Sequence, residues 1–196
     1  MQSDLAAIVL AGGRGSRMGR DKALLEVDGA PLVAHVTARL REVASPIVVV
    51  AAPKQNLPTL PGVRVERDLE SFPGPLAALS VGLAACGEAR WCWVTGVDMP
   101  HVRPAVVSAM CKLAEGHEAA ALERDGRLEC LGIVLSTSLE PRVRALLDAG
   151  KRSMRALLEA SRVHVVRADA FAPELQSDVR EAFVDWDEPS DVTRRR

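Results

Sequence analysis

The sequence predicts an α/β protein, a Rossmann-like three-layer sandwich in which helices cover both faces of a mostly parallel central sheet. Short apolar runs alternate with longer segments of helical periodicity through most of the 196 residues. Runs such as 5–10 and 91–97 are apolar at nearly every position, which is typical of strands buried on both faces. Regular alternation of strands and helices indicates a parallel sheet. Without an internal repeat or a low-complexity linker, we expect a single domain over 1–196, with 194–196 as a frayed basic tail.

Strands are expected where the apolar runs lie. Most of these runs are rich in β-branched residues, and each is too short to form a typical helix. In chain order the expected strands occupy residues 5–10, 46–52, 63–66, 91–97, 119–122, 132–135 and 163–166.

Helices are expected between these strands, where apolar residues recur every three or four positions. In the segment 31–43, Leu32, Val36 and Leu40 share one helical face, and Pro31 suits the first turn of a helix. The other expected helices occupy residues 75–86, 102–113, 139–148 and 153–160. The proline-rich segment 52–62 is expected to be an irregular loop.

Composition excludes several classes of protein. The net charge is −1 and tyrosine is absent, so neither a basic surface nor aromatic stacking platforms for nucleic acid are expected. No apolar run reaches the ~20 residues that span a bilayer, and no basic segment precedes the first run as in a signal peptide. The cysteines lack the C-x-x-C spacing of a zinc site or redox pair, so we expect buried thiols of a cytoplasmic protein. They are Cys86, Cys92, Cys111 and Cys130.

A glycine-rich, basic loop follows the first expected strand, in the stretch VLAGGRGSRMGRDK from Val9 to Lys22. In parallel α/β sheets, ligands bind beyond the carboxyl ends of the strands. Glycine allows the backbone to approach a ligand closely, and successive N–H groups can surround phosphate oxygens. The Walker A pattern is absent, and the spacing is one residue too long for the dinucleotide pattern G-x-G-x-x-G. The loop is therefore either a different phosphate-binding loop or a flexible surface loop with scattered cations.

The whole stretch resembles the signature L-A-G-G-x-x-x-R-M-G-x-D-K of the molybdenum cofactor nucleotidyltransferases. The matching positions are Leu10, Ala11, Gly12, Gly13, Arg17, Met18, Gly19, Asp21 and Lys22. The resemblance implies a fold like that of the nucleotide-diphospho-sugar transferases. It also implies that Leu10, Ala11, Gly12, Gly13 and Lys22 bind a nucleotide, with Arg17 and Lys22 as catalytic cations. The cytidylyltransferase relatives usually have LAAG at the start of this signature, so the LAGG here favours GTP over CTP.

Two later landmarks add carboxylates. Asp98 lies in VTGVDMP directly after an expected strand, where a carboxylate could hold Mg²⁺ or could simply begin a turn before Pro100. The family has an acidic D-x-P here, which implies that Asp98 is a catalytic, nucleotide-binding and Mg²⁺-binding residue. The family also has an acidic residue followed by G-P-L-A, which implies that Asp68 and Gly74 bind the nucleotide. A carboxylate such as Asp68 can pair with the guanine edge or with ribose hydroxyls, or it can be a solvated loop residue.

The sequence departs from the family pattern at two places. The family asparagine that contacts the nucleotide after the second strand is replaced by Ala51. Near the C-terminus, Asp185 and Asp187 stand where N-x-N-T-P is common, and the resemblance implies a second metal site or the pterin side of the site. Asp187 could equally cap a helix before Pro189.

The resemblance implies a Mg²⁺-dependent enzyme that transfers GMP from GTP to molybdopterin and releases pyrophosphate, giving the molybdopterin guanine dinucleotide cofactor. It also implies contacts with proteins that deliver the cofactor and mature molybdoenzymes. The attacking phosphate is already anionic, so positioning and charge stabilisation, rather than a strong base, are expected to dominate catalysis. A molybdopterin cytidylyltransferase, another small-substrate nucleotidyltransferase and a non-catalytic GTP-binding regulator are the alternatives. The wrong glycine spacing disfavours a nicotinamide-dependent oxidoreductase.

Overall fold

The computed structural model describes residues 4–12, 21–69, 74–184 and 186. Its central sheet has the strand order β10-β7-β9-β6-β1-β4-β5, and β8 pairs with β7 beside this path. The strands of this sheet are β1 (Leu5–Leu10), β4 (Ile47–Ala51), β5 (Val63–Arg67), β6 (Trp91–Gly96), β7 (Ala119–Arg124), β8 (Arg127–Leu128), β9 (Ile133–Ser136) and β10 (Val163–Val166). The short strands β2 (Glu26–Val27) and β3 (Ala30–Pro31) form a separate antiparallel pair.

The central sheet is mostly parallel, as the sequence predicts. β1 lies between β4 and β6 and runs parallel to both, and β5 continues this parallel half at the edge. Two strands are exceptions. The short strand β8 is antiparallel to β7, and β9 is antiparallel to both β6 and β7. Consequently β6 and β7 point the same way. The carboxyl ends of β1, β4, β5 and β6 therefore meet at one edge of the sheet.

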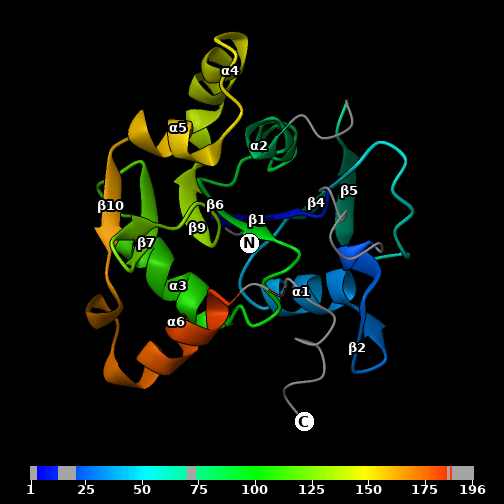
Figure 1. The fold of residues 1–196 in the computed structure, drawn as a ribbon, viewed down its shortest axis with the longest axis horizontal. Coiled ribbons are helices and arrows are strands. Elements are labelled where there is room, and N and C mark those ends of the chain that lie inside the picture. Colours follow the sequence, from blue (N-terminus) through cyan, green and yellow to red (C-terminus); the bar gives the residue numbers. More distant parts are fainter. Residues whose placement is uncertain (1–3, 13–20, 70–73, 185, 187–196) are drawn as a thin grey trace.

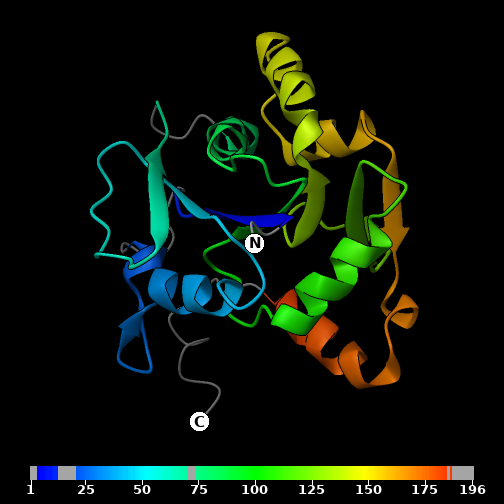
Figure 2. The ribbon, with the colours of Figure 1, turned by 180° about the vertical axis from the view of Figure 1, so that it is seen from behind.

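Helices cover both faces of the sheet, so the three-layer architecture is confirmed (Figures 1 and 2). The helices are α1 (Leu32–Leu40), α2 (Pro75–Ala84), α3 (Pro104–Leu113), α4 (Glu140–Asp148), α5 (Met154–Glu159) and α6 (Gln176–Ala182). Helices α1, α3 and α6 pack on one face, and α2, α4 and α5 on the other. Side chains of β1 alternate between the two layers, with Ala7 and Val9 in the first core and Ala6 and Ile8 in the second. This double burial explains why the strand is apolar at every position.

Some elements were not predicted from the sequence. The strand pair β2–β3, strand β8 and helix α6 are short, and their apolar residues are too few to establish a period. Two of the four thiols, Cys86 and Cys92, are buried as expected, whereas Cys111 and Cys130 are only half-buried because they lie at the margins of the core. Among the described residues, no helix has the length and apolar character needed to cross a membrane.

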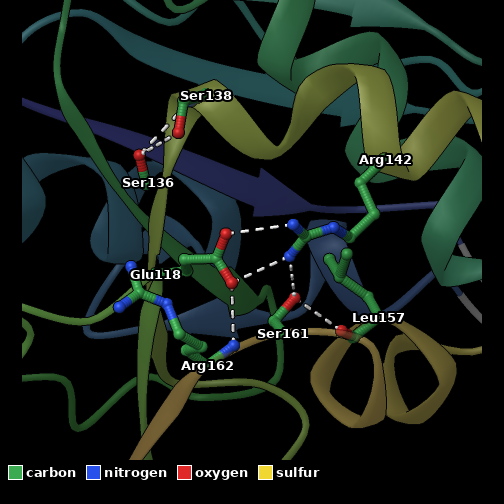
Figure 3. Close-up of polar contacts among 7 residues, drawn as sticks. All are labelled: Glu118, Ser136, Ser138, Arg142, Leu157, Ser161 and Arg162. Atoms are coloured by element: carbon green, nitrogen blue, oxygen red, sulfur yellow. Dashed lines mark hydrogen bonds and ion pairs between the residues drawn. The ribbon is translucent and has the colours of Figure 1, made fainter.

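A polar cluster joins elements in the half of the sheet that contains β7, β9 and β10 (Figure 3). Glu118, which precedes β7, accepts hydrogen bonds from both terminal nitrogens of Arg142 on α4, at 2.9 and 3.0 Å. The backbone N–H of Arg162 donates to the same carboxylate at 2.8 Å. Ser161 extends the cluster by donating to the Leu157 carbonyl at the end of α5. One carboxylate therefore ties β7, α4 and the start of β10 together.

Candidate nucleotide-binding site

The candidate site lies at the edge of the sheet where β1, β4, β5 and β6 end. Gly12 follows β1, Ala52 follows β4, Asp68 follows β5 and Asp98 follows β6. The Gly12 N–H donates to the Val50 carbonyl at 3.2 Å, which joins the first loop to β4. These residues come together because parallel strands place their carboxyl ends side by side, at the position where α/β proteins bind ligands.

A cation from the first loop meets a carboxylate from the fourth parallel strand. The Nζ atom of Lys22 lies 3.2 Å from Oδ2 of Asp98, and both side chains are partly buried. Asp21 precedes Lys22, and its carboxylate accepts a hydrogen bond from the Ala23 N–H at 3.0 Å, which caps a short 3₁₀ turn at Lys22–Leu24. The turn fixes the backbone from which Lys22 extends. Two residues that the family resemblance assigns to one site are therefore in contact although 76 positions separate them in the sequence.

Asp98 is held in place by its own neighbours. A Cβ atom on Gly96 would lie 2.2 Å from Oδ1 of Asp98, so the carboxylate folds back over a position that only glycine can occupy. The backbone N–H of Trp186 donates to the Asp98 carbonyl at 2.9 Å. The sequence analysis did not identify this role of Gly96, whose missing side chain leaves room for the Asp98 carboxylate. A glycine two residues before an aspartate at a strand end is the signal that could have indicated it.

Asp68 is the most unusual carboxylate of this edge. Asp68 is only 7% exposed, and its Oδ1 atom has no hydrogen-bond partner among the described residues. Burial raises the pKa of Asp68 to about 6. A buried carboxylate oxygen without a donor costs free energy, so Oδ1 of Asp68 is the atom of this carboxylate that a ligand donor would satisfy. Its other oxygen lies 3.5 Å from the position of a Cβ atom on Gly12, so Asp68 faces the first loop.

The first loop leaves little room for side chains next to Asp68. A Cβ atom on Gly12 would lie 3.1 Å from the Ala52 nitrogen, so glycine allows this close approach of two loops. The N–H groups of Ala11 and Gly12 both donate to Val50, so these amides already have partners within the protein. Leu10 ends β1 and is buried, so its side chain belongs to the core. Of this group, Gly12 contributes space at the site.

Gly74 has a clear structural role at the start of α2. Its φ of 97° is unfavourable for other residues, and a Cβ atom there would lie 2.8 Å from the Arg152 carbonyl. The same carbonyl accepts a hydrogen bond from the Leu76 N–H in the first turn of α2. Gly74 therefore allows the start of α2 to pack against the segment that precedes α5.

A glutamine that sequence reasoning missed connects two of these loops. Gln55 follows β4, and its side-chain Nε2 lies 3.0 Å from the Ala11 carbonyl and 2.9 Å from each carboxylate oxygen of Asp21. Its Oε1 accepts a hydrogen bond from the Ala52 N–H at 2.9 Å. Only its place in the loop after a parallel strand could have suggested it. Four predicted site residues, Gly13, Arg17, Asp185 and Asp187, and the predicted tail 194–196 lie outside the described residues.

Comparison with known proteins identifies the family. The model of the MobA-like NTP transferase domain matches residues 7–166, which extend from within β1 to the end of β10. The chain belongs to the MobA-like NTP transferase family. It is therefore a nucleotidyltransferase, in agreement with the prediction from the loop signature.

Two mycobacterial relatives are similar over most of the chain. A protein from Mycobacterium tuberculosis H37Rv, named "Probable molybdenum cofactor guanylyltransferase", is 43% identical over 172 residues, which cover 85% of each chain. A protein of the same name from Mycobacterium avium strain 104 is 43% identical over 162 residues, covering 80% of this chain and 82% of that protein.

Solved structures share the fold. Molybdopterin-guanine dinucleotide biosynthesis protein A from Archaeoglobus fulgidus aligns with a TM-score of 0.74 and 24% identity, covering 96% of this chain and 95% of its own. The 2-C-methyl-D-erythritol 4-phosphate cytidylyltransferase from Thermus thermophilus aligns with a TM-score of 0.69 and 19% identity, covering 95% of this chain and 94% of its own. These similarities confirm the expected nucleotide-diphospho-sugar-transferase-like fold.

Proposed function

We propose that this protein transfers GMP from GTP to molybdopterin, releasing pyrophosphate and forming the molybdopterin guanine dinucleotide cofactor. The contact between Lys22 and Asp98 at the carboxyl edge of the sheet is the observation that carries the proposal. A cation able to bind phosphate oxygens thus lies beside a carboxylate of the kind that Mg²⁺ prefers, which supports the proposal. The names of the relatives that share 43% of their aligned residues with this chain support the same reaction.

The donor set fits Mg²⁺ that arrives with its nucleotide. The described residues contain no group of three side chains able to enclose a metal ion. Mg²⁺ commonly uses one or two carboxylates and completes its shell with phosphate oxygens and water. Asp98 is the carboxylate that would hold it, and the ion would neutralise charge on the triphosphate. Asp185 and Asp187 are proposed as a second metal site or as part of the pterin side.

The chemical step forms one bond and breaks one. An oxygen of the terminal phosphate of molybdopterin attacks the α-phosphorus of GTP, and the bond to the bridging oxygen breaks as pyrophosphate leaves. Lys22 binds triphosphate oxygens once its ammonium group exchanges Asp98 for the nucleotide, and Arg17 supplies a second positive charge. Because the attacking phosphate is already anionic, these residues act by positioning the reactants and by stabilising negative charge.

Asp68 supports guanine as the base. The guanine edge offers two adjacent donors, N1–H and the N2 amino group, which a carboxylate can accept together. Cytosine offers one amino group beside an acceptor nitrogen, which a carboxylate repels. A buried carboxylate with an oxygen lacking a partner among the described residues therefore favours GTP over CTP. Cytidylyl transfer remains the second candidate because Ala51 removes the family asparagine.

The proposal also covers the partners and the location of the protein. GTP and molybdopterin are the small-molecule partners. Proteins that deliver the cofactor or mature molybdoenzymes are the expected protein partners. A cytoplasmic location agrees with cysteines that are all free thiols in the structure.

A nucleotide-selectivity assay tests this function. Purified protein is given molybdopterin and Mg²⁺ with either GTP or CTP, and pyrophosphate release and dinucleotide formation are measured. We expect GTP to be preferred by at least about tenfold, since a lost pair of donors to a buried carboxylate costs at least that factor. Lys22→Ala and Asp98→Ala should each remove most of the turnover while the melting temperature stays close to that of the wild type. Equal or greater activity with CTP would establish the cytidylyltransferase alternative, and GTP binding without turnover would indicate a regulator.

A further inference from the structure

We propose that Gln55 is a positioning residue for nucleotide binding, acting on Lys22 through the carboxylate of Asp21. The inference deepens the proposed function, because it concerns how this chain holds its triphosphate-binding lysine. Gln55 is half-buried in the loop after β4, 34 positions from Asp21 in the sequence. Neither residue needs to touch the nucleotide for this role.

The side chain of Gln55 spans two loops of the site. Its Nε2 donates to the Ala11 carbonyl at the end of β1 and to both carboxylate oxygens of Asp21. Its Oε1 accepts from the Ala52 N–H. Both ends of the amide are therefore engaged within the protein. An amide used in this way orients neighbouring groups and is not available to read the base.

The loop that carries Gln55 is itself held rigidly. The Gln55 N–H donates to the Ala52 carbonyl at 3.1 Å, which closes a tight turn. The guanidinium group of Arg67 on β5 donates to the Ala52 carbonyl at 3.0 Å and to the Gln55 carbonyl at 2.7 Å. Gln55 thus extends from a turn fixed to two neighbouring strands, so it can impose a position on Asp21.

Asp21 transmits that position to Lys22. Its Oδ1 accepts hydrogen bonds both from Gln55 and from the Ala23 N–H, which caps the 3₁₀ turn Lys22–Leu24. When the Gln55 donor is lost, the carboxylate is free to rotate and the cap weakens. Lys22 is the first residue of that turn, and the Nζ atom at the end of its side chain lies 3.2 Å from Oδ2 of Asp98. A small rotation at Asp21 is therefore enlarged along the lysine side chain.

An exchange of donor and acceptor tests the inference. Gln55→Glu replaces the donor with a carboxylate that faces Asp21, and we expect GTP binding to weaken at least about fivefold. Adding Asp21→Asn to it restores an amide–carboxylate hydrogen bond with the roles exchanged, because the new asparagine amide can donate to position 55 while its oxygen still caps Ala23. The double variant should therefore bind GTP more tightly than Gln55→Glu alone. Affinity is measured by titration calorimetry well below the melting temperature of every variant.

Exchange of the Ala23 amide hydrogen, measured without nucleotide, provides a second readout. It should accelerate in Gln55→Glu and slow again in the double variant. Asn56→Ala, at an exposed position in the same loop, is the matched control and should change neither readout. Independent, additive effects of Gln55→Glu and Asp21→Asn on GTP affinity would overturn the inference, as would unchanged affinity and exchange in Gln55→Glu. If the wild type fails to bind GTP while Ala23 exchange responds as expected, the proposed function fails and the positioning of Lys22 stands.

Discussion

At the scale of single residues, two carboxylates at one sheet edge have opposite surroundings. Asp98 has the ammonium group of Lys22 at 3.2 Å. Asp68 is buried, and this burial raises its pKa to about 6. Its Oδ1 atom lacks a donor among the described residues. Differences of this kind between neighbouring acids commonly separate their roles. This difference agrees with the proposed roles, in which Asp98 serves phosphate and metal chemistry and Asp68 recognises the base.

The raised pKa of Asp68 predicts a pH dependence of GTP binding. The ionised carboxylate accepts the guanine donors, and protonation below about pH 6 replaces an acceptor with a donor. GTP affinity should therefore fall as the pH is lowered from 7.5 to 5, by about tenfold for each pH unit below the pKa. Titration calorimetry across this range checks the prediction. An affinity that is constant down to pH 5 would show that the Asp68 carboxylate does not contact the base.

Asp68→Asn separates this effect from other titrations. The variant should bind GTP weakly at pH 7.5 and lose the pH dependence between 7.5 and 5. It should also be more stable than the wild type above pH 6. The raised pKa means that the folded state binds the proton more tightly than the unfolded state, so ionisation of Asp68 lowers the free energy of unfolding as the pH rises through 6. A gain in melting temperature with a loss of affinity is the signature of a residue kept for function.

At the scale of elements, the sequence predicts best the strands and helices whose apolar residues form a regular pattern. The run at β1 and the periodicity of α1 and α3 identified these elements, because burial on a defined face leaves a pattern. Lys22 could be singled out because it belongs to a long specific signature, and Asp98 because it matches the short D-x-P landmark after a strand. Gln55 could not, since its role depends on a contact with Asp21 that only the fold creates. Helix α6 has seven residues, and only Val179 and Ala182 are buried, which is too few to show a period.

The packing of α2 on β1 gives a prediction at this scale. Gly82 lies in the interior of α2, and a Cβ atom there would lie 2.7 Å from Cγ2 of Ile8. Gly82→Ala should gain about 1 kcal/mol in helix propensity, but overpacking of a core typically costs about 1–3 kcal/mol, so we expect net destabilisation. Denaturant unfolding measures the change. Ala84→Leu, at an exposed position of the same helix, should change the free energy of unfolding by less than about 0.5 kcal/mol. A Gly82→Ala variant more stable than the wild type would show that α2 is free to shift on the sheet.

At the scale of the whole molecule, the two halves of the sheet have different tasks. The parallel half, from β6 to β5, ends at the residues of the candidate site. The other half contains the antiparallel strand β9 and depends on Glu118 to join β7, α4 and the start of β10 (Figure 3). Hydrogen bonds lower the pKa of Glu118 to about 2. The larger effect comes from the Arg142 guanidinium group and the smaller from the Arg162 N–H. Ionised Glu118 therefore adds a stabilising contribution to this half of the sheet.

Acid unfolding tests this dependence. The lowered pKa means that the unfolded state binds the proton more tightly, so Glu118 stabilises the fold fully above its ordinary pKa of 4.5 and loses this contribution as the pH falls towards 2. Glu118→Gln should lower the melting temperature at pH 7, and the difference from the wild type should shrink between pH 4.5 and 2. Glu123→Gln, which removes the exposed pair with Arg167, is the control and should have little effect at any pH. A Glu118→Gln difference that persists unchanged at pH 2 would mean that shape, and not charge, holds the cluster together. GTP affinity at pH 7 should be unchanged in Glu118→Gln, because Glu118 lies before β7, at the end of the sheet opposite to the site.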